Sequence, residues 1–233
     1  MTTFKKLSNL RDIFFRKSPY YKKLNFFSRI TRHAILNQLT ALKGNLELTR
    51  ESAGDPGLIT SIEKELAAAE TIQHQILFTR DYQDIGIQPP EWQKVRNVIL
   101  RSGTGSRLGN VSVTVLVKGV EVYADLLLGK VFHNLVDNAI LHGGTLTQVS
   151  FTCEESFEEL VIFCEDDGIG IHGDAKENIF NRQHAGDSGL GLFISREILS
   201  ITGISICETG IPGKGARFEI HVPQGAYRFV NGD

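Results

Sequence analysis

Residues 127–140 combine a helical apolar repeat with two asparagines, and this segment restricts the possible folds more than any other. Its apolar side chains recur at steps of three to four residues, the period of a helix with one buried face: Leu127, Leu128, Val131, Leu135 and Ile140. Asn134 and Asn138 are four residues apart, so a helix places them on one face. Their amide oxygens suit a hard cation such as Mg²⁺. The alternative is a helix with two solvated asparagines, and the segments that follow favour the metal site.

Three further segments follow in an informative order. The strand-like residues 160–164 lead into acids and alternate glycines at 165–171, where backbone can approach a flat ligand closely. The glycine-rich residues 188–191 open an apolar helix, and such a helix start binds phosphate because free amides and the helix dipole favour an anion. Residues 213–215 then enter the last strand. Each segment alone is weak evidence for a function, but the segments together, in this order, are a specific signal.

In this order, the segments resemble the ATP-binding domain of sensor histidine kinases, within the superfamily that also contains gyrase, Hsp90 and MutL. The resemblance covers residues from about 93 to 225, plus a segment nearer the N-terminus. It implies an α/β sandwich with a mixed sheet on one side and helices on the other. It also implies ATP and Mg²⁺ as ligands, and a mobile lid between Gly170 and Gly189.

The same resemblance assigns roles to individual residues. Asp166 would accept a hydrogen bond from the adenine amino group, and Asn138 would ligate Mg²⁺ with Asn134 assisting. Gly168 and Gly170 would shape the adenine pocket. Phosphate contacts, lid packing and further nucleotide contacts fall by motif match to His142, Phe180, Arg182, Gly189, Leu190 and Gly191.

Two positions depart from the family pattern. Asp187 stands where the lid usually carries a glycine, two residues before Gly189. Leu141 stands where many relatives carry a lysine that contacts phosphate. Both changes remove favourable contacts with phosphate, so we expect a lower nucleotide affinity than is usual in the family.

The N-terminal part of the chain predicts two helices joined by a short break. Residues 24–50 carry two adjacent apolar stripes, a face too wide for a lone surface helix. Glycine and proline in residues 53–57 end this helix, and a second apolar helix follows over residues 58–82. Two antiparallel helices cannot bury such faces alone. We therefore expect a homodimer in which two hairpins form a four-helix bundle.

Residues 31–40 of the first helix resemble the phosphoacceptor box of histidine kinases, in the variant with an asparagine four residues after the histidine. A lone helical histidine is more often structural, but the ATP motifs downstream make His33 the candidate acceptor of the ATP γ-phosphate. Asn37 lies one turn away on the same face, where it could orient a water that dephosphorylates a partner.

Ala34 is the departure with the largest consequence. Kinases of this type usually carry Asp or Glu beside the histidine, where it hydrogen-bonds the ring and helps to remove its proton. Loss of a positioned general base lowers a rate by about 10²–10⁴-fold. Three explanations stay open: a weak kinase, a dimer kept for phosphatase or scaffold work, and a chain altered to block phosphorylation.

Composition and charge bear on the partners and the compartment. The net charge of −2 indicates neither nucleic acid nor membrane as an overall partner, although residues 1–32 hold nine basic residues against one acid. A solvated linker is the favoured interpretation of this basic segment. The sequence has no run of about 18 apolar residues that would predict a membrane span. Cys153, Cys164 and Cys207 are scattered, which favours reduced thiols in the cytoplasm.

We therefore expect four parts: a basic segment (1–23), a dimerisation and phosphotransfer hairpin (24–84), a linker (85–92) and an ATP-binding domain (93–233). In the last part, residues 111–117 alternate like a strand, and residues 121–124 are expected to pair with them. The other elements expected there are helices at 95–100 and 190–202 and strands at 146–153, 159–165, 204–209 and 215–223.

The leading hypothesis is a histidine protein kinase core that phosphorylates His33 and passes the phosphate to an aspartate on a response regulator. No sensor domain is recognised before the hairpin, so either a separate sensor protein supplies the input or the chain is a fragment. A hypothesis of another class is a dimeric ATP-binding adaptor or response-regulator phosphatase, which Ala34, Leu141 and Asp187 support. An ATPase like MutL or Hsp90 fits the ATP motifs but not the hairpin, and it needs a carboxylate where Asn134 stands.

Overall fold

The computed structural model describes residues 19–102, 111–181 and 190–230. The chain divides into two compact units. Residues Met1–Ile87 form the helical unit and residues Gln88–Asp233 form the α/β unit.

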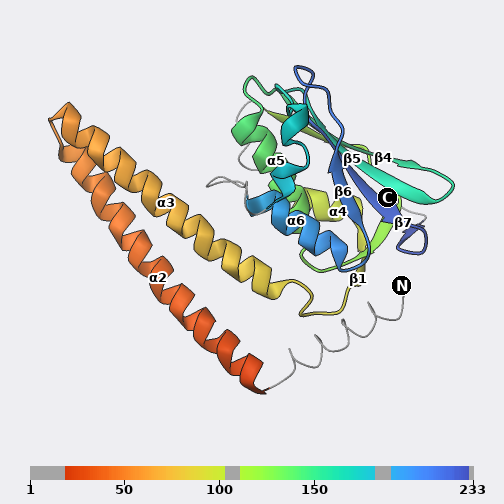
Figure 1. Ribbon diagram of the computed structural model, residues 1–233, viewed down its shortest axis with the longest axis horizontal. Helices are drawn as coiled ribbons and strands as arrows, with labels where there is room; N and C mark the ends of the chain where they lie inside the picture. The colour runs from red at the N-terminus through yellow and green to blue at the C-terminus, as the bar shows by residue number, and fades with distance from the viewer. Residues whose placement is uncertain (1–18, 103–110, 182–189, 231–233) are drawn as a thin grey trace. The chain divides into compact units, whose positions relative to one another are not determined.

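The described part of the helical unit is a hairpin of two long helices (Figure 1). Helix α2 spans Pro19–Ser52 and helix α3 spans Pro56–Asp84, so both are longer than the apolar pattern predicts. Asp55 is the N-cap of α3, where its carboxylate accepts hydrogen bonds from the amides of Gly57 at 3.2 Å and Leu58 at 3.3 Å. The proline at the first helical position needs no hydrogen-bond partner for its nitrogen. The hairpin that the sequence predicts is confirmed.

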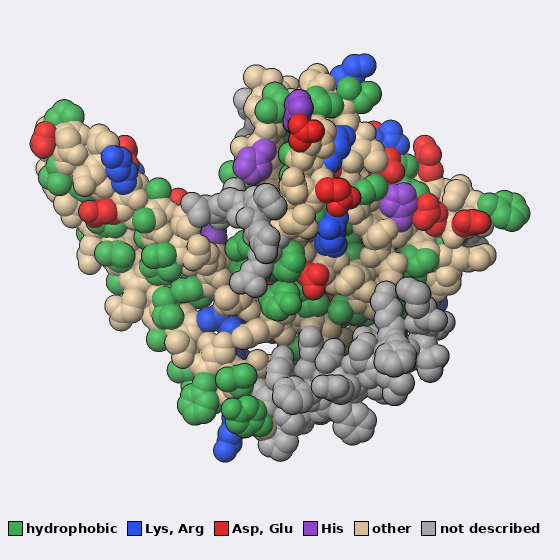
Figure 2. Space-filling view, viewed as in Figure 1, with side chains coloured by type: hydrophobic (Ala, Val, Ile, Leu, Met, Phe, Trp, Pro, Cys, Tyr) green, Lys and Arg blue, Asp and Glu red, His purple; other side chains and the backbone are tan. Residues whose placement is uncertain are grey.

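Few apolar side chains are buried within this hairpin. Leu39, Ile62, Leu66 and Ala69 are at most 9% exposed. Many larger apolar side chains remain exposed on the two helices: Leu24, Phe26, Phe27, Ile30, Ile35, Leu42, Leu48, Leu58 and Ile72. Figure 2 shows hydrophobic side chains at the surface along the hairpin. None of the described helices is both long and apolar enough to cross a bilayer.

The α/β unit contains a five-stranded mixed sheet, as predicted. Strand β2 runs parallel to β4, and the other neighbouring strands are antiparallel. In spatial order the strands are β2 (Ser112–Val115), β4 (Gln148–Glu155), β5 (Glu159–Asp166), β7 (Arg217–Pro223) and β6 (Ser205–Glu208).

Helices cover one face of this sheet (Figure 1), namely α4 (Val95–Arg101), α5 (Leu128–His142) and α6 (Leu190–Ser200). Phe132 of α5 packs edge-to-face on Phe151 of β4, with 5.7 Å between ring centroids. Along β7, buried residues such as Ile220 alternate with half-exposed residues such as His221. This alternation is the pattern of a sheet with one face in the core, and the unit is the α/β sandwich that the sequence predicts.

The α/β unit also has a second sheet, of three antiparallel strands, which the sequence does not predict. Its order is β1-β3-β8, with bounds Glu91–Lys94, Val120–Ala124 and Tyr227–Phe229. The predicted pairing of residues 111–117 with 121–124 is therefore wrong, because β2 pairs with β4 instead. Alternation of side chains identifies a strand but says nothing about which strand lies beside it. Residues 91 and 92, assigned to the linker by the sequence, are the first residues of β1.

Candidate nucleotide and phosphoacceptor sites

Asp166 is the last residue of β5, and the backbone holds its carboxylate in place. Oδ1 accepts hydrogen bonds from the amides of Gly168 at 2.9 Å and Ala216 at 3.1 Å. Two separate segments of the main chain therefore fix the orientation of the carboxylate. Because both bonds go to Oδ1, Oδ2 is the oxygen that can accept a hydrogen bond from a ligand.

Glycines allow the backbone to cross itself closely beside Asp166. A Cβ at Gly215 would lie 1.8 Å from the carbonyl oxygen of Asp166, and a Cβ at Gly168 would lie 2.5 Å from that of Gly143. Gly170 has a φ of +70°, and a Cβ there would lie 2.8 Å from the carbonyl oxygen of Gly215. Only glycine fits at these crossings. Three of the predicted adenine-pocket residues thus lie together, and Gly215 joins them.

Asn134 is buried on α5 and connects this helix to α6. Its side chain is 7% exposed, and Nδ2 donates to the carbonyl oxygen of Gly191 at 2.8 Å and to Oγ of Ser195 at 3.1 Å. A Cβ at Gly191 would lie 3.3 Å from Cγ of Asn134, so glycine lets the two helices approach. The amide nitrogen therefore serves helix packing, and only Oδ1 is left to assist a cation.

Asn138 lies one turn further along α5, and its Nδ2 is buried without a hydrogen-bond partner among the described residues. Leaving a buried donor unpaired costs about 1–3 kcal/mol, so such a group commonly has a ligand or water as its partner. Nδ2 suits a phosphate oxygen and Oδ1 suits Mg²⁺. The residues present at this end of α5 therefore fit a nucleotide with its cation.

The other predicted nucleotide contacts come from three places. Leu190 and Gly191 begin α6, and the amides of a first helical turn lack intrahelical partners and favour an anion. His142 ends α5 and is exposed, as is Leu141 beside it. Two other predicted contact residues, Arg182 and Gly189, lie outside the described part of the chain, as does Asp187, which stands in place of the usual lid glycine.

Phe180 anchors the segment that precedes residue 182. It belongs to a single 3₁₀ turn, η2 (Asn178–Phe180), that follows a similar turn η1 (Gly173–Ala175). Its ring is 2% exposed and packs edge-to-face on Phe218 of β7, with 6.3 Å between centroids. The guanidinium carbon of Arg196 lies 4.5 Å above the same ring. Packing, rather than a ligand contact, is what the structure gives Phe180.

Lys176 and Glu208 form an ion pair that the sequence does not predict. Nζ of Lys176 lies 2.7 Å from Oε2 of Glu208, whose side chain is completely buried. Nζ also donates to the carbonyl oxygen of Gly210, and Oε1 of Glu208 accepts from the amides of Gly210 at 2.9 Å and Arg217 at 3.2 Å. The pair thus fastens the segment before η2 to the loop that reaches Ala216 beside Asp166.

Asp167 directly follows Asp166 but has a different role. Its Oδ1 accepts hydrogen bonds from the amides of Thr147 and Gln148, both at 2.9 Å, and its Oδ2 accepts one from the Thr147 hydroxyl. These hydrogen bonds lower the pKa of Asp167 to about 2, and the bond from the Thr147 hydroxyl contributes most. Asp167 therefore joins the end of β5 to the start of β4 and is occupied by the protein itself.

Residues 124–226 match the family described as "Histidine kinase-, DNA gyrase B-, and HSP90-like ATPase". Sensor protein SrrB of Staphylococcus aureus is 30% identical over 124 residues, which cover 49% of this chain and 21% of that protein. The α/β unit is a sensor histidine kinase ATP-binding domain. The matched range contains α5 with its two asparagines, the turn after Asp166, and α6.

Solved structures show the same two-part fold. Histidine kinase ThkA, in complex with the response regulator protein TrrA, has a TM-score of 0.57 at 23% identity and covers 97% of this chain and 68% of its own. Full-length ShkA in complex with AMPPNP has a TM-score of 0.57 at 18% identity, over 87% of this chain and 45% of its own. Both likenesses extend beyond the ATP-binding domain, so this chain shares with these two structures the fold of a helical hairpin followed by an α/β domain.

His33 and Asn37 lie one turn apart on the exposed surface of α2. Nδ2 of Asn37 is 3.3 Å from Nδ1 of His33, so Nε2 is the ring nitrogen that Asn37 does not contact. Ala34 is also exposed, and its methyl group cannot accept a proton. The structure thus brings the two predicted residues of the phosphoacceptor box together, with one imidazole nitrogen open to a partner.

Proposed function

We propose that this chain is the core of an ATP-dependent protein histidine kinase that acts in the cytoplasm. It would transfer the γ-phosphoryl group of ATP to His33 and pass it on to an aspartate of a response regulator, with a separate sensor protein as a possible source of input. The observation that carries the proposal is the exposed His33 on a helical hairpin, joined to an ATP-binding domain in the same chain.

In the proposed complex with ATP, Oδ2 of Asp166 accepts a hydrogen bond from the adenine amino group. The glycine crossings beside Asp166 leave room for the flat base, and Nδ2 of Asn138 gains a phosphate oxygen as its missing partner. Amides at the start of α6 face the phosphates. Mg²⁺, held by Oδ1 of Asn138 with Asn134 assisting, would neutralise phosphate charge.

The transfer step needs a neutral nitrogen on His33. Nε2 attacks the γ-phosphorus, the bond from that phosphorus to the bridging oxygen breaks, and ADP leaves with the electron pair. The proton on the ring nitrogen must then leave. When Nε2 attacks, the ring proton lies on Nδ1, beside the Asn37 carboxamide, whose oxygen can turn to accept that N–H and hold the ring. Ala34 cannot take the proton, which goes to water. Alignment of nucleotide and acceptor does most of the catalytic work in this scheme, because no positioned base assists.

The proposal includes a homodimer. The exposed apolar side chains on α2 and α3 outnumber the few that the hairpin buries, and a second hairpin would cover them. Pairing of two hairpins gives a four-helix bundle with His33 on its surface, where a response regulator can reach it. Two copies related by a two-fold axis would use the same face of each hairpin.

A second candidate function, a response-regulator phosphatase or an ATP-binding adaptor, is favoured by Ala34. Without a carboxylate beside His33, autophosphorylation would be slow, whereas the Asn37 amide could still position a water against a phosphoaspartate. ATP binding would then act as a conformational signal rather than a source of phosphate.

Incubation of the full chain with γ-labelled ATP and Mg²⁺ tests the proposal. We expect an acid-labile label that disappears in His33→Gln. His74→Gln is the matched control, because His74 is an exposed histidine on the other helix of the same hairpin, and it should keep the label. Label that persists in His33→Gln would contradict the assignment. Nucleotide binding without label in any variant would exclude autophosphorylation and leave the phosphatase or adaptor as the function.

A further inference from the structure

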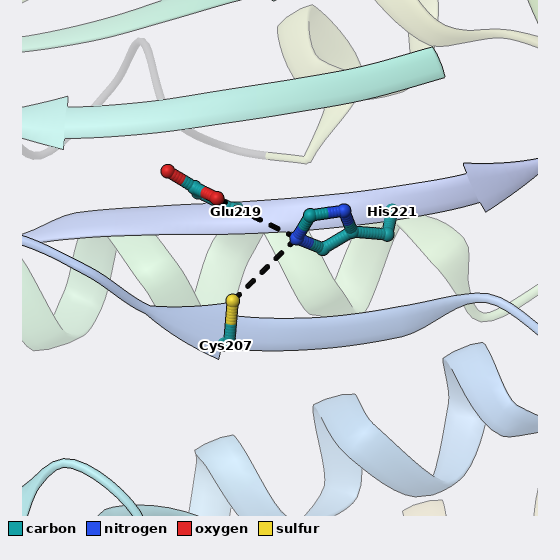
Figure 3. Close-up of side chains that lie close together, drawn as sticks. All are labelled: Cys207, Glu219 and His221. Carbon is teal, nitrogen blue, oxygen red and sulfur yellow. Dashed lines mark hydrogen bonds and ion pairs between the residues drawn. The ribbon is translucent and has the colours of Figure 1, made fainter. Parts of the chain in front are cut away.

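Cys207, Glu219 and His221 meet on the sheet face that the helices do not cover (Figure 3). Cys207 lies on β6, and the other two lie two residues apart on the adjacent strand β7. Nε2 of His221 is 3.5 Å from Sγ of Cys207 and 3.5 Å from Oε2 of Glu219. One ligand atom from each residue lies within 4.8 Å of the others, and all three side chains are partly exposed to solvent.

The histidine is oriented as a metal ligand requires. Nδ1 of His221 is 3.0 Å from Oε1 of Glu159 on β5, on the side of the ring away from Cys207. A carboxylate at this position holds the proton on Nδ1, so the lone pair of Nε2 points toward Cys207 and Glu219. Histidine ligands in metal sites almost always donate the other ring N–H to a carboxylate, a backbone carbonyl or a water.

Glu219 is oriented in a similar way. Its Oε1 accepts a hydrogen bond from the Thr209 hydroxyl at 2.8 Å and lies 3.3 Å from Nε of Arg217. These contacts occupy one carboxylate oxygen and turn Oε2 toward His221. Two of the three candidate ligands therefore have a supporting contact that fixes the direction of the donor atom.

We propose that Sγ of Cys207, Nε2 of His221 and Oε2 of Glu219 bind Zn²⁺, with a fourth position open to water. Bonds of about 2.0–2.3 Å in a tetrahedral zinc site place neighbouring ligand atoms about 3.3–3.6 Å apart. Both distances to Nε2, 3.5 Å each, lie in this range. A thiolate with an imidazole selects zinc over Mg²⁺, so this site differs from the cation site of ATP.

The electrostatic surroundings suit a cation. Burial, followed by the negative charges of Glu219, Glu177 and Glu208, raises the pKa of the Cys207 thiol. The same carboxylates produce a negative potential at Sγ, and Zn²⁺ would balance the charges of one thiolate and one carboxylate. Without a metal, the alternative is a network of polar contacts in which His221 bridges Glu159 and Glu219.

Titration of the metal-free full chain with Zn²⁺ and with Co²⁺, in the absence of nucleotide, separates these alternatives. We expect one equivalent of Zn²⁺ by calorimetry and, with Co²⁺, the near-ultraviolet charge-transfer band of a thiolate ligand. That band identifies a thiolate and so excludes binding at histidines elsewhere. Glu159→Gln, which keeps an acceptor oxygen beside Nδ1 of His221 but removes its negative charge, should weaken Zn²⁺ binding by about 10-fold.

Cys207→Ser and Cys153→Ser form the matched pair of variants. Cys153 is a partly exposed thiol on β4, away from the cluster, and Cys153→Ser should keep the band. Cys207→Ser should lose it while its thermal unfolding stays cooperative, which shows that the domain is folded. No thiolate band with Co²⁺, or the same band in Cys207→Ser, would overturn the proposal. Because the readout needs no ATP, its failure would leave the kinase proposal untouched.

Discussion

The two units of this chain bury their apolar side chains to very different extents. In the α/β unit, Phe132, Phe151, Leu160 and Val222 are each 0% exposed, and they fill a closed core between helices and sheet. In the helical unit, most large apolar side chains on α2 and α3 remain at the surface. Apolar area removed from water is the main source of stability. We therefore expect the α/β unit to be stable alone and the hairpin to require a second surface.

The two candidate sites also differ, in how firmly the protein holds the functional side chain. Asp166 is held by two backbone amides and surrounded by glycine crossings that no other residue fits. His33 is exposed and held by one side-chain contact at 3.3 Å. A fixed site suits recognition of one ligand, and an exposed residue suits contact with several protein surfaces in turn.

The largest expected effect is a gain of function in the hairpin. Ala34→Asp should raise the initial rate of acid-labile labelling from γ-labelled ATP by about 10²–10⁴-fold, because it restores a carboxylate that can accept the ring proton. Gln38→Asp is the control, since it adds the same charge at an exposed position on the same helix. An equal gain in both variants, or no gain in Ala34→Asp, would contradict the view that the missing carboxylate at residue 34 limits the labelling rate.

The second largest effect is expected at Asp166, in the nucleotide site whose carboxylate the backbone holds in place. In Asp166→Asn, the amide oxygen would take the place of Oδ1 on the two backbone amides. The NH₂ group would then face the adenine amino group, and two donors would meet. Loss of a hydrogen bond to a charged group is worth about 1.5–3 kcal/mol, so the ATP Kd should rise by on the order of 100-fold.

Asp167→Asn provides the matched control for that measurement by calorimetry. The change is chemically identical and only one residue away, but Asp167 is bonded to Thr147 and Gln148. ATP affinity should stay close to that of the unchanged chain. Equal losses in the two variants would mean that Asp166 has no special contact with the base.

The smallest effect is the dependence of stability on pH at Asp167. Hydrogen bonds lower its pKa from the ordinary 3.8 to about 2, so the stabilising contribution is present above pH 3.8 and is lost as the pH falls toward 2. The thermal midpoint of Asp167→Asn should therefore be lower than that of the unchanged chain at pH 7. This difference should shrink between pH 4 and pH 2. A difference that is constant over this range would contradict the hydrogen-bonded turn.

Much of the fold could be predicted because its signals are local. The repeat over residues 127–140 predicts α5, and the glycines after Asp166 predict a close backbone approach that the structure has. Pairing of strands is not local. Alternation identifies residues 121–124 as a strand, but their partners come from β1 and from β8, which has only three residues.

The site was only partly predictable for the same reason. Spacing places Asn134 and Asn138 on one face of a helix, but it cannot show that Asn134 donates to α6 while Nδ2 of Asn138 has no partner among the described residues. The ion pair between Lys176 and the buried Glu208 joins segments far apart in the sequence, and neither residue has a local pattern around it. Such contacts depend on how elements pack, which no single segment encodes.

The most direct test of this account is the mass of the full chain in solution, measured by sedimentation equilibrium. If a second copy covers the exposed apolar face of the hairpin, the mass should be about twice the 25.9 kDa of one chain. Leu42→Asp, which places a charge at an exposed apolar position of α2, should shift the mass toward one chain. A mass of 25.9 kDa for the unchanged chain at all concentrations would contradict the account.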